Sequence, residues 1–239
     1  MKTPKPFVLS LLVCILLGIL RTDSSRAQSP QAPAAGAQSK PAEFPITGGP
    51  IPIRVLVQSP ADAQTDLQII CLFRSDPSNT LHGSLAELNE KLGGLLEKIR
   101  TPSLFRGELG ETIVLAPPSG TLAARRLLMI GLGDSGTFAP DRMELVGSIA
   151  YRESFRLNSA NPYFAPTILD GGVTKFATGE VAAEFVHGFL RAMRSHDVLL
   201  AAGAAPPKII ASLTFLAGPT HAADTERAIK AALAPAASK

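Results

Sequence analysis

Cysteine is scarce in this chain of 239 residues, which contains only Cys14 and Cys71. Cys14 lies in an apolar run near the N-terminus, and Cys71 lies in the apolar segment IICLF. If the N-terminal run is removed, Cys71 has no partner within the chain, so an internal disulfide is excluded. Stability must then come from an apolar core. We expect Cys71 to be a small buried apolar residue and not a catalytic thiol.

An excess of charge of one sign is also missing once residues 1–27 are set aside. Those residues contain four of the 23 Lys and Arg but only one of the 20 Asp and Glu, so the remainder is neutral overall. The remainder has no polybasic run and no stripe of aromatic and basic residues. Proteins that bind nucleic acid need such features, so no nucleic-acid partner is expected.

The usual motifs of hydrolytic catalysis are absent, and no H-E-x-x-H sequence occurs. The four histidines are scattered along the chain: His82, His187, His196 and His221. We expect surface or hydrogen-bonding roles for them and not metal ligation. None of the candidate nucleophiles Ser84, Ser119 and Ser135 lies in a G-x-S-x-G motif, so a serine hydrolase triad is not expected.

Residues 1–27 have the pattern of a secretory signal peptide. Two lysines precede an apolar run over residues 7–20, and residues 25–27 read Ser-Arg-Ala, a small-x-small cleavage site. The run is about 14 residues long, shorter than the roughly 20 that a membrane-spanning helix needs. We therefore expect a secreted or periplasmic protein that contacts the membrane only through this segment, before cleavage.

The composition then divides the rest of the chain into a linker and one folded domain. Residues 28–50 are rich in Pro, Ala, Gln, Ser and Gly, with few large apolar residues. Such a segment buries too little surface to offset the entropy lost on ordering. We predict a disordered linker over 28–50 and a folded domain over 51–235.

Alternating apolar and amphipathic runs predict the elements of this domain. Short β-rich runs predict strands over 53–57, 67–73, 111–118, 124–133, 164–169 and 208–218. Helical spacing of apolar residues predicts helices over 83–100, 140–157, 178 to beyond 193, and 225–233. The third helix has its apolar stripe at Val181, Phe185, Phe189 and Met193.

The order of these elements predicts the fold class. The strands at 111–118 and 124–133 are joined by a link too short for a crossover helix, so they should form an antiparallel hairpin. The other strands alternate with helices. The pattern predicts an α/β fold, a three-layer α/β/α sandwich with a mixed sheet.

Two local features of the predicted helix over 83–100 concern its start and its interior. Ser84 and Glu87 have the spacing of a capping box at its start. Gly93 and Gly94 each cost about 1 kcal/mol relative to alanine inside a helix. They indicate either close packing of a neighbour or a local break.

Residues 131–136 read G-L-G-D-S-G, which matches the G-x-G-x-x-G of dinucleotide-binding enzymes. That motif needs a helix to begin within the glycine turn, so that free amides face the phosphates. Here the preceding strand belongs to a hairpin, and the next helix begins only near Pro140. We expect instead that Gly131 and Gly133 let the strand end tightly beneath a loop.

Two other polar stretches permit alternative interpretations. Asp170-Gly171-Gly172 is either an anion-binding nest of backbone amides or, as we favour, a plain turn. Arg125-Arg126 is expected to lie on a solvated strand edge.

The run GELGETIVLAPPSGTLAARRLLMIGLGD resembles the N-terminal domain of the leucyl aminopeptidase family of two-metal peptidases. The segments DLQIICLF, LLEKIR, SLFRGELGET and KIIASLTFLAG extend the resemblance, in the expected order, over residues 53–233. The resemblance implies a macro-like α/β/α fold that lies apart from the family's catalytic centre. In this family the metals are held by a C-terminal domain with the signature NTDAEGRL, and this sequence contains neither that signature nor a substitute set of carboxylates.

The resemblance therefore implies a non-catalytic protein with no catalytic, cofactor-binding or metal-binding residues and no cofactor. We expect an exported binding or regulatory module. One alternative is an accessory subunit whose protein partner is a separately encoded catalytic peptidase domain. Another is a macro-like binder of a nucleotide or ADP-ribose, through the loops after Gly131 or Asp170.

Overall fold

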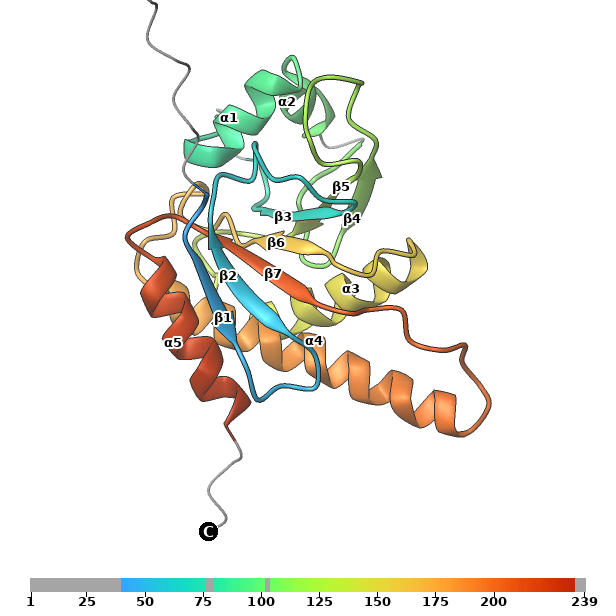
Figure 1. Cartoon of the computed structure of the whole chain (residues 1–239). Helices are drawn as coiled ribbons and strands as arrows, with labels where there is room; N and C mark the ends of the chain where they lie inside the picture. Colours follow the sequence, from blue (N-terminus) through green and yellow to red (C-terminus); the bar gives the residue numbers. More distant parts are fainter. Residues whose placement is uncertain (1–39, 76–79, 102–103, 235–239) are drawn as a thin grey trace, which may run out of the picture. The chain divides into compact units, whose positions relative to one another are not determined.

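The computed structural model describes residues 40–75, 80–101 and 104–234 (Figure 1). The strands in these residues are β1 (Glu43–Ile46), β2 (Ile53–Val57), β3 (Gln68–Leu72), β4 (Thr112–Leu115), β5 (Leu127–Gly131), β6 (Tyr163–Ala165) and β7 (Leu213–Ala217). The helices are α1 (Gly83–Lys91), α2 (Leu95–Ile99), α3 (Arg142–Arg156), α4 (Thr178–Ala201) and α5 (Ala222–Leu233). The predicted signal peptide lies outside the described residues.

The described strands form one mixed sheet in the order β1-β2-β7-β6-β3-β5-β4. The five inner strands, from β2 to β5 in this order, are mutually parallel, and the two edge strands pair antiparallel. The predicted hairpin is β4–β5, with Ile113 opposite Met129. Because the inner strands are parallel, their carboxyl ends all meet at one edge of the sheet, which is where ligands bind in such sheets.

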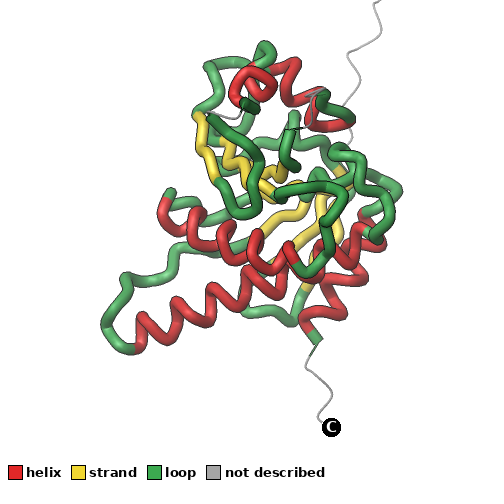
Figure 2. Tube along the Cα trace, turned by 180° about the vertical axis from the view of Figure 1, so that it is seen from behind, coloured by secondary structure: helices red, strands yellow, loops and turns green. Residues whose placement is uncertain are grey.

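Each face of the sheet is covered by its own helices, as Figures 1 and 2 show. In β3, Ile69 and Cys71 pack into the apolar cluster formed with α3, α4 and α5. The alternate residues Ile70 and Leu72 pack into the cluster formed with α1 and α2. Because successive side chains of this fully buried strand point to opposite faces, β3 contributes residues to both apolar clusters. The predicted three-layer α/β/α sandwich is confirmed.

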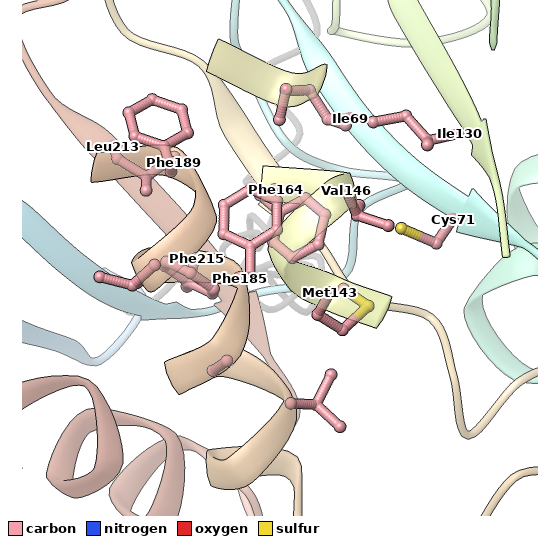
Figure 3. Close-up of a cluster of buried hydrophobic side chains, with 14 of the residues drawn as sticks. Ile69, Cys71, Ile130, Met143, Val146, Phe164, Phe185, Phe189, Leu213 and Phe215 are labelled. Carbon is pink, nitrogen blue, oxygen red and sulfur yellow. The ribbon is translucent and has the colours of Figure 1, made fainter. Parts of the chain in front are cut away.

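The larger core is built around aromatic side chains from the sheet and α4 (Figure 3). The ring of Phe164 stacks on that of Phe185 with centroids 3.7 Å apart, and Phe215 meets Phe185 edge-on at 5.4 Å. All three are fully buried. Each such side chain contributes about 1.5–3 kcal/mol by its burial. The predicted apolar stripe of α4 is the surface that makes these contacts.

Helices α3 and α4 approach each other to backbone contact at two glycines. A Cβ added at Gly188 would lie 2.7 Å from the Cα of Glu144, and one added at Gly147 would lie 2.8 Å from the amide nitrogen of Phe189. Both distances are below the 3.0 Å that real Cβ contacts respect. Ser148 Oγ also donates to the carbonyl of Gly188 at 3.0 Å. Only glycine therefore permits this packing.

The predicted disordered linker over 28–50 is wrong for residues 43–46, which form β1. This strand pairs antiparallel with β2, and Ile46 is buried opposite Ile53. An edge strand accepts Pro45, because its missing amide can face away from the ladder. Composition failed here because one buried side chain and a paired backbone suffice to hold a short strand. Residues 28–39 lie outside the described residues.

The predicted helix over 83–100 is divided into α1 and α2 by Gly93 and Gly94. Their φ angles are +63° and +79°, which glycine adopts readily. A Cβ at Gly93 would meet nothing within 4 Å, so no neighbour packs closely there, and the glycines break the helix. The predicted capping box is wrong, because the cap residue is His82, whose side chain makes no capping bond.

The remaining element boundaries differ from the prediction mainly in length. Helix α4 continues to Ala201, β7 begins only at Leu213, and β6 ends at Ala165. In the described part of the chain, none of the helices combines the length and the apolar character that crossing a membrane would require.

Candidate functional site

Gly131 and Gly133 are packed beneath a loop, as expected. A Cβ at Gly131 would lie 2.6 Å from the carbonyl carbon of Gly107, so no other residue fits there. The amides of Gly131, Leu132 and Gly133 donate to the carbonyls of Glu111, Leu72 and Gly107 at 2.8 Å each. Helix α3 begins only at Arg142. These amides are therefore engaged within the protein and do not face an open phosphate site.

Asp170-Gly171-Gly172 forms a turn. The amides of Gly171 and Gly172 donate to the carbonyls of Ile168 and Leu169 at 3.2 and 3.0 Å, which closes the loop after β6. The Asp170 carboxylate reaches the start of α1 and accepts a 2.5 Å hydrogen bond from Ser84 Oγ. Gly83 has no Cβ to block this approach. Asp170 thus supplies the capping group that the sequence of α1 lacks.

The pKa of Asp170 is raised above its ordinary value by burial, an effect that the Ser84 hydroxyl, the amides of Ser84 and Leu85 and the charge of His82 only partly offset. Folding favours the protonated form of a carboxyl whose pKa is higher in the folded state than in the unfolded state. Its contribution to stability is fully present below the unfolded-state pKa of about 4 and is lost as the pH rises through the folded-state pKa.

We expect the stabilities of the parent protein and of D170N to depend differently on pH. On lowering the pH from 7 to 4, the melting temperature of the parent should rise relative to that of the variant. The measurement is thermal unfolding of both proteins across that range. A difference that stays constant, or that moves in favour of D170N, would contradict the raised pKa.

Thr167 follows β6 by two residues, and its side chain hydrogen-bonds to the neighbouring strand β3. Its Oγ1 accepts from the amide of Cys71 at 3.0 Å and donates to the carbonyl of the same residue at 2.5 Å. The φ of Thr167 is +52°, an unusual value for a β-branched residue. The chain turns away from the sheet at this point, and a hollow opens beside the strand end.

This hollow is a cavity of about 470 Å³ at the carboxyl ends of β2, β6 and β7, which we call the carboxyl-edge cavity. Its walls come from the loops after these strands and from the starts of α1, α4 and α5. The lining residues are Val57, Gln58, Ser59, Pro60, Ser84, Ala165, Pro166, Thr167, Ile168, Leu169, Asp170, Thr178, Leu216, Ala217, Gly218, Pro219, His221 and Thr225. Its volume falls in the range of small-molecule sites.

Most of the cavity wall is apolar, and its polar groups are few. Thr178, the first residue of α4, contributes a buried hydroxyl oxygen that has no hydrogen-bond partner. The next amide, that of Gly179, is already capped by the Asp224 carboxylate at 2.9 Å. Tyr151, Ser154 and Ser159 carry buried hydroxyls of the same kind elsewhere in the core. Because the Thr178 oxygen is closed off from solvent, a ligand in the cavity would reach it only after the side chain rotated.

A second hollow, of about 960 Å³, lies at the opposite edge of the sheet, among residues 43–54, 64–66 and 160–163. It surrounds the amino ends of the strands, where the fold does not direct loops around a ligand. We therefore take the carboxyl-edge cavity as the candidate site.

The histidines predicted to be non-ligating occupy four different settings. His82 is exposed beside α1, and His221 lines the carboxyl-edge cavity. His196 is buried, and its Nε2 lies 2.8 Å from the carbonyl of Pro206. His196 lies in the same helix as His187, because α4 extends to Ala201.

His187 lies with Glu184 and Glu144 in a group whose ligand atoms are all within 4.8 Å of one another. Among the described residues this is the set that could hold a metal ion. The guanidinium of Arg191 already pairs with Glu144, so an ion would have to displace it. A single exposed group of this kind differs from a two-metal centre of converging carboxylates.

The other predicted polar residues fall outside the cavity, except Ser84. Ser119 and Ser135 are exposed on loops. The expectation of a solvated edge holds for the exposed Arg125 but is wrong for Arg126, which pairs with Asp66 and donates to the carbonyl of Leu157. Cys71 is fully buried, as expected, and burial raises the pKa of its thiol far above the ordinary value.

Sequence reasoning missed that the hydroxyl of Thr178 is unpaired and that Asp224 lies beside the start of α4. Thr178 is the first residue of α4, and the cap position is Ala177. The carboxylate of Asp224, at the start of α5, accepts from the amide of Gly179. Neither property has a signal in a single sequence.

Residues 69–196 match the model of the cytosol aminopeptidase family, N-terminal domain. A probable cytosol aminopeptidase from a Cyanothece strain is 28% identical over 102 residues, which are 43% of this chain and 20% of that protein. The chain therefore spans about a fifth of the length of this relative.

Solved structures with the same fold include macrodomains and a leucine aminopeptidase. A macrodomain from Oceanobacillus iheyensis with bound MES superposes with a TM-score of 0.56 at 15% identity, covering 80% of this chain and 97% of the macrodomain. A Trypanosoma brucei macrodomain in complex with ADP-ribose gives 0.54 at 13% identity, covering 74% and 68%. A tomato leucine aminopeptidase variant gives 0.53 at 22% identity, covering 82% of this chain and 37% of the enzyme. The predicted macro-like fold is confirmed.

Proposed function

Because this chain belongs to the cytosol aminopeptidase family, through that family's N-terminal domain, we propose that it is a non-catalytic binding module whose ligand occupies the carboxyl-edge cavity. The observation that carries the proposal is a ligand-sized, largely apolar cavity at the carboxyl ends of β2, β6 and β7. The cavity lies where parallel α/β sheets bind their ligands.

Replacing Thr178 with valine tests this function in two ways. The change keeps the shape of the side chain and removes a hydroxyl that has no partner, so the ligand-free protein should gain about 1 kcal/mol of stability. The same change should weaken a ligand that bonds to the hydroxyl. Thermal unfolding measures the first effect, and calorimetry or NMR titration measures the second. A destabilised variant would mean that the hydroxyl has a partner in the folded protein.

The non-catalytic part of the proposal is supported by the match to an N-terminal domain and by the set of polar groups in the described residues. We expect no hydrolysis of leucine anilide by the purified chain with added manganese or zinc. Hydrolysis that depends on the metal and co-purifies with the chain would overturn this expectation. A cytosol aminopeptidase assayed in parallel serves as the positive control.

Export completes the proposal, and the pattern of residues 1–27 supports it. If those residues are a cleaved signal peptide, the mature protein begins at Gln28. N-terminal sequencing of the protein recovered from the medium or periplasm checks this. Recovery of the chain only from the cytoplasm with Met1 intact would contradict it.

A second function, as an accessory subunit of a separately encoded aminopeptidase, is favoured by one observation. The tomato enzyme has the same fold over about a third of its length, which corresponds to one part of a larger chain. Co-purification of a peptidase with a tagged copy of this protein would support this role. A monodisperse monomer with no cross-linked partner in an extract of the producing cells would argue against it.

A third function, the binding of ADP-ribose or another nucleotide, follows from the macrodomain neighbours. Structures of these proteins are described as complexes with ADP and with ADP-ribose. Calorimetry with ADP-ribose tests the idea on this chain. Absence of heat at millimolar ligand would exclude it.

A further inference from the structure

We propose that the carboxyl-edge cavity selects a small ligand with an apolar body and a cationic end, such as a primary ammonium group, and rejects anions such as phosphates. This inference rests on the proposed binding function and names the class of ligand. It is argued from the charge of the cavity wall, from the occupants of the helix ends beside it and from the amides of its loops.

One acidic side chain, that of Asp170, lines the cavity. Among its lining residues there is no lysine or arginine, whereas Asp170 contributes a carboxylate. His221 is the only other titratable side chain in the lining. A phosphate entering such a wall would meet a negative charge and no fixed positive charge, whereas a cation would be attracted.

Two of the three helix starts beside the cavity, those of α1 and α4, are already occupied by carboxylates of the protein. At the third, that of α5, the amides of His221 and Ala222 donate to the carbonyl of Gly218. Asp170 lies at the start of α1, where Ser84 Oγ donates to it. Asp224 lies at the start of α4, where the amide of Gly179 donates to it. Free amides at helix starts are what make such ends anion sites. With both ends neutralised, an anionic ligand gains nothing from them and is repelled by the carboxylates.

Several amides of the loops around the cavity are engaged within the protein. After β6, the amides of Gly171, Gly172 and Val173 donate to carbonyls of the same turn. After β7, the amides of His221 and Ala222 donate to the carbonyl of Gly218. These five amides are therefore not available to a phosphate.

The remaining wall is suited to a hydrocarbon body. The apolar side chains that line the cavity are Val57, Ala165, Ile168, Leu169 and Leu216, with Pro60, Pro166 and Pro219 between them. An ammonium group carries three donors and no acceptor. The Asp170 carboxylate lies in the cavity wall and can accept from it.

Three compounds with one hydrocarbon body test the charge preference directly. Cyclohexylmethylamine, cyclohexylmethanol and cyclohexanecarboxylate are titrated into the protein near neutral pH, with ADP-ribose as a fourth probe, and binding is followed by NMR shifts of cavity residues. We expect the amine to bind most tightly, roughly tenfold or more above the carboxylate, because only the amine pairs with Asp170.

Two variants separate charge from shape. D170N should remove the advantage of the amine over the carboxylate. S119A changes an exposed loop residue outside the cavity, so it should keep the preference for the amine. Circular dichroism and thermal unfolding show whether each variant is folded. Should D170N fail to fold, the ratio of the three affinities on the parent and S119A proteins still decides the question.

The outcomes distinguish this inference from the proposed function. If the carboxylate or ADP-ribose binds more tightly than the amine, the cavity binds ligands but its charge selection is overturned. If all three cyclohexyl compounds bind equally, the cavity selects shape alone, and the charge selection is again wrong. If none of the four probes shifts a cavity residue, both the selection and the proposed use of this cavity are contradicted.

Discussion

Replacing Gly188 with alanine is expected to destabilise the protein by about 3 kcal/mol or more, enough to leave a marginally stable domain largely unfolded. The added Cβ would lie inside the backbone of Glu144 on α3, 2.7 Å from its Cα. Backbone cannot rotate away as a side chain can, so the two helices would have to separate. Separation would also break the bond from Ser148 to Gly188.

The intrinsic helix propensities of the two residues favour alanine over glycine and would therefore raise the stability of the variant. Alanine inside a helix is favoured over glycine by about 1 kcal/mol, so G188A in an isolated α4 would stabilise it. A net loss in the protein therefore reports the contact between helices and not the propensity. Urea unfolding of the parent and of G188A measures the difference in free energy.

A glycine outside the helix contact supplies the matched control. Gly218 lies in the loop after β7, and a Cβ there would meet only His221 Cδ2, at 3.8 Å. G218A should change the free energy of unfolding by less than about 1 kcal/mol. If G188A behaves like G218A, α3 and α4 do not pack at backbone contact in solution.

Much of the fold could be predicted from the sequence because its signals are local. The alternation in IICLF, the apolar stripe of α4 and the short link of the β4–β5 hairpin each depend on neighbouring residues. The predictions that were wrong depend on partners far away in the chain. β1 exists because β2 pairs with it, and β6 ends early because Thr167 takes over its hydrogen bonds to Cys71.

The candidate site was less predictable for the same reason. Asp170 was recognised only as part of a turn, and its contact with Ser84 spans 86 residues of sequence. The unpaired state of the Thr178 hydroxyl is a property of everything packed around it and leaves no mark in the residues beside it. The family resemblance predicted the fold correctly, but a fold shared with macrodomains does not specify the ligand.

The charge of the cavity illustrates how proteins with one fold can differ in the class of ligand that they bind. A sheet with five parallel inner strands and a cavity at its carboxyl edge is the shared feature, and alone it would suggest an anion at a helix start. In this chain two carboxylates, Asp170 and Asp224, occupy those starts. Two side chains can thus change the class of ligand while the backbone stays the same.

Replacing Thr167 with valine should have the opposite effect to the same replacement at Thr178. The hydroxyl of Thr167 serves both the amide and the carbonyl of Cys71, at 3.0 and 2.5 Å, and Cys71 is fully buried. Valine has nearly the same shape and would leave both backbone groups without partners. Each such group costs about 1–3 kcal/mol, so we expect T167V to lose about 3 kcal/mol of stability.

The comparison of the two variants isolates the hydrogen bonds, since each exchanges one hydroxyl for one methyl group in the wall of the same cavity. T167V should lower the free energy of unfolding measured in urea, whereas T178V should raise it. Hydrogen exchange at the amide of Cys71 adds a local readout, because loss of its acceptor should speed exchange in T167V only. Equal and small effects of both variants would mean that Thr167 does not bond to Cys71, and that the end of β6 is held by packing alone.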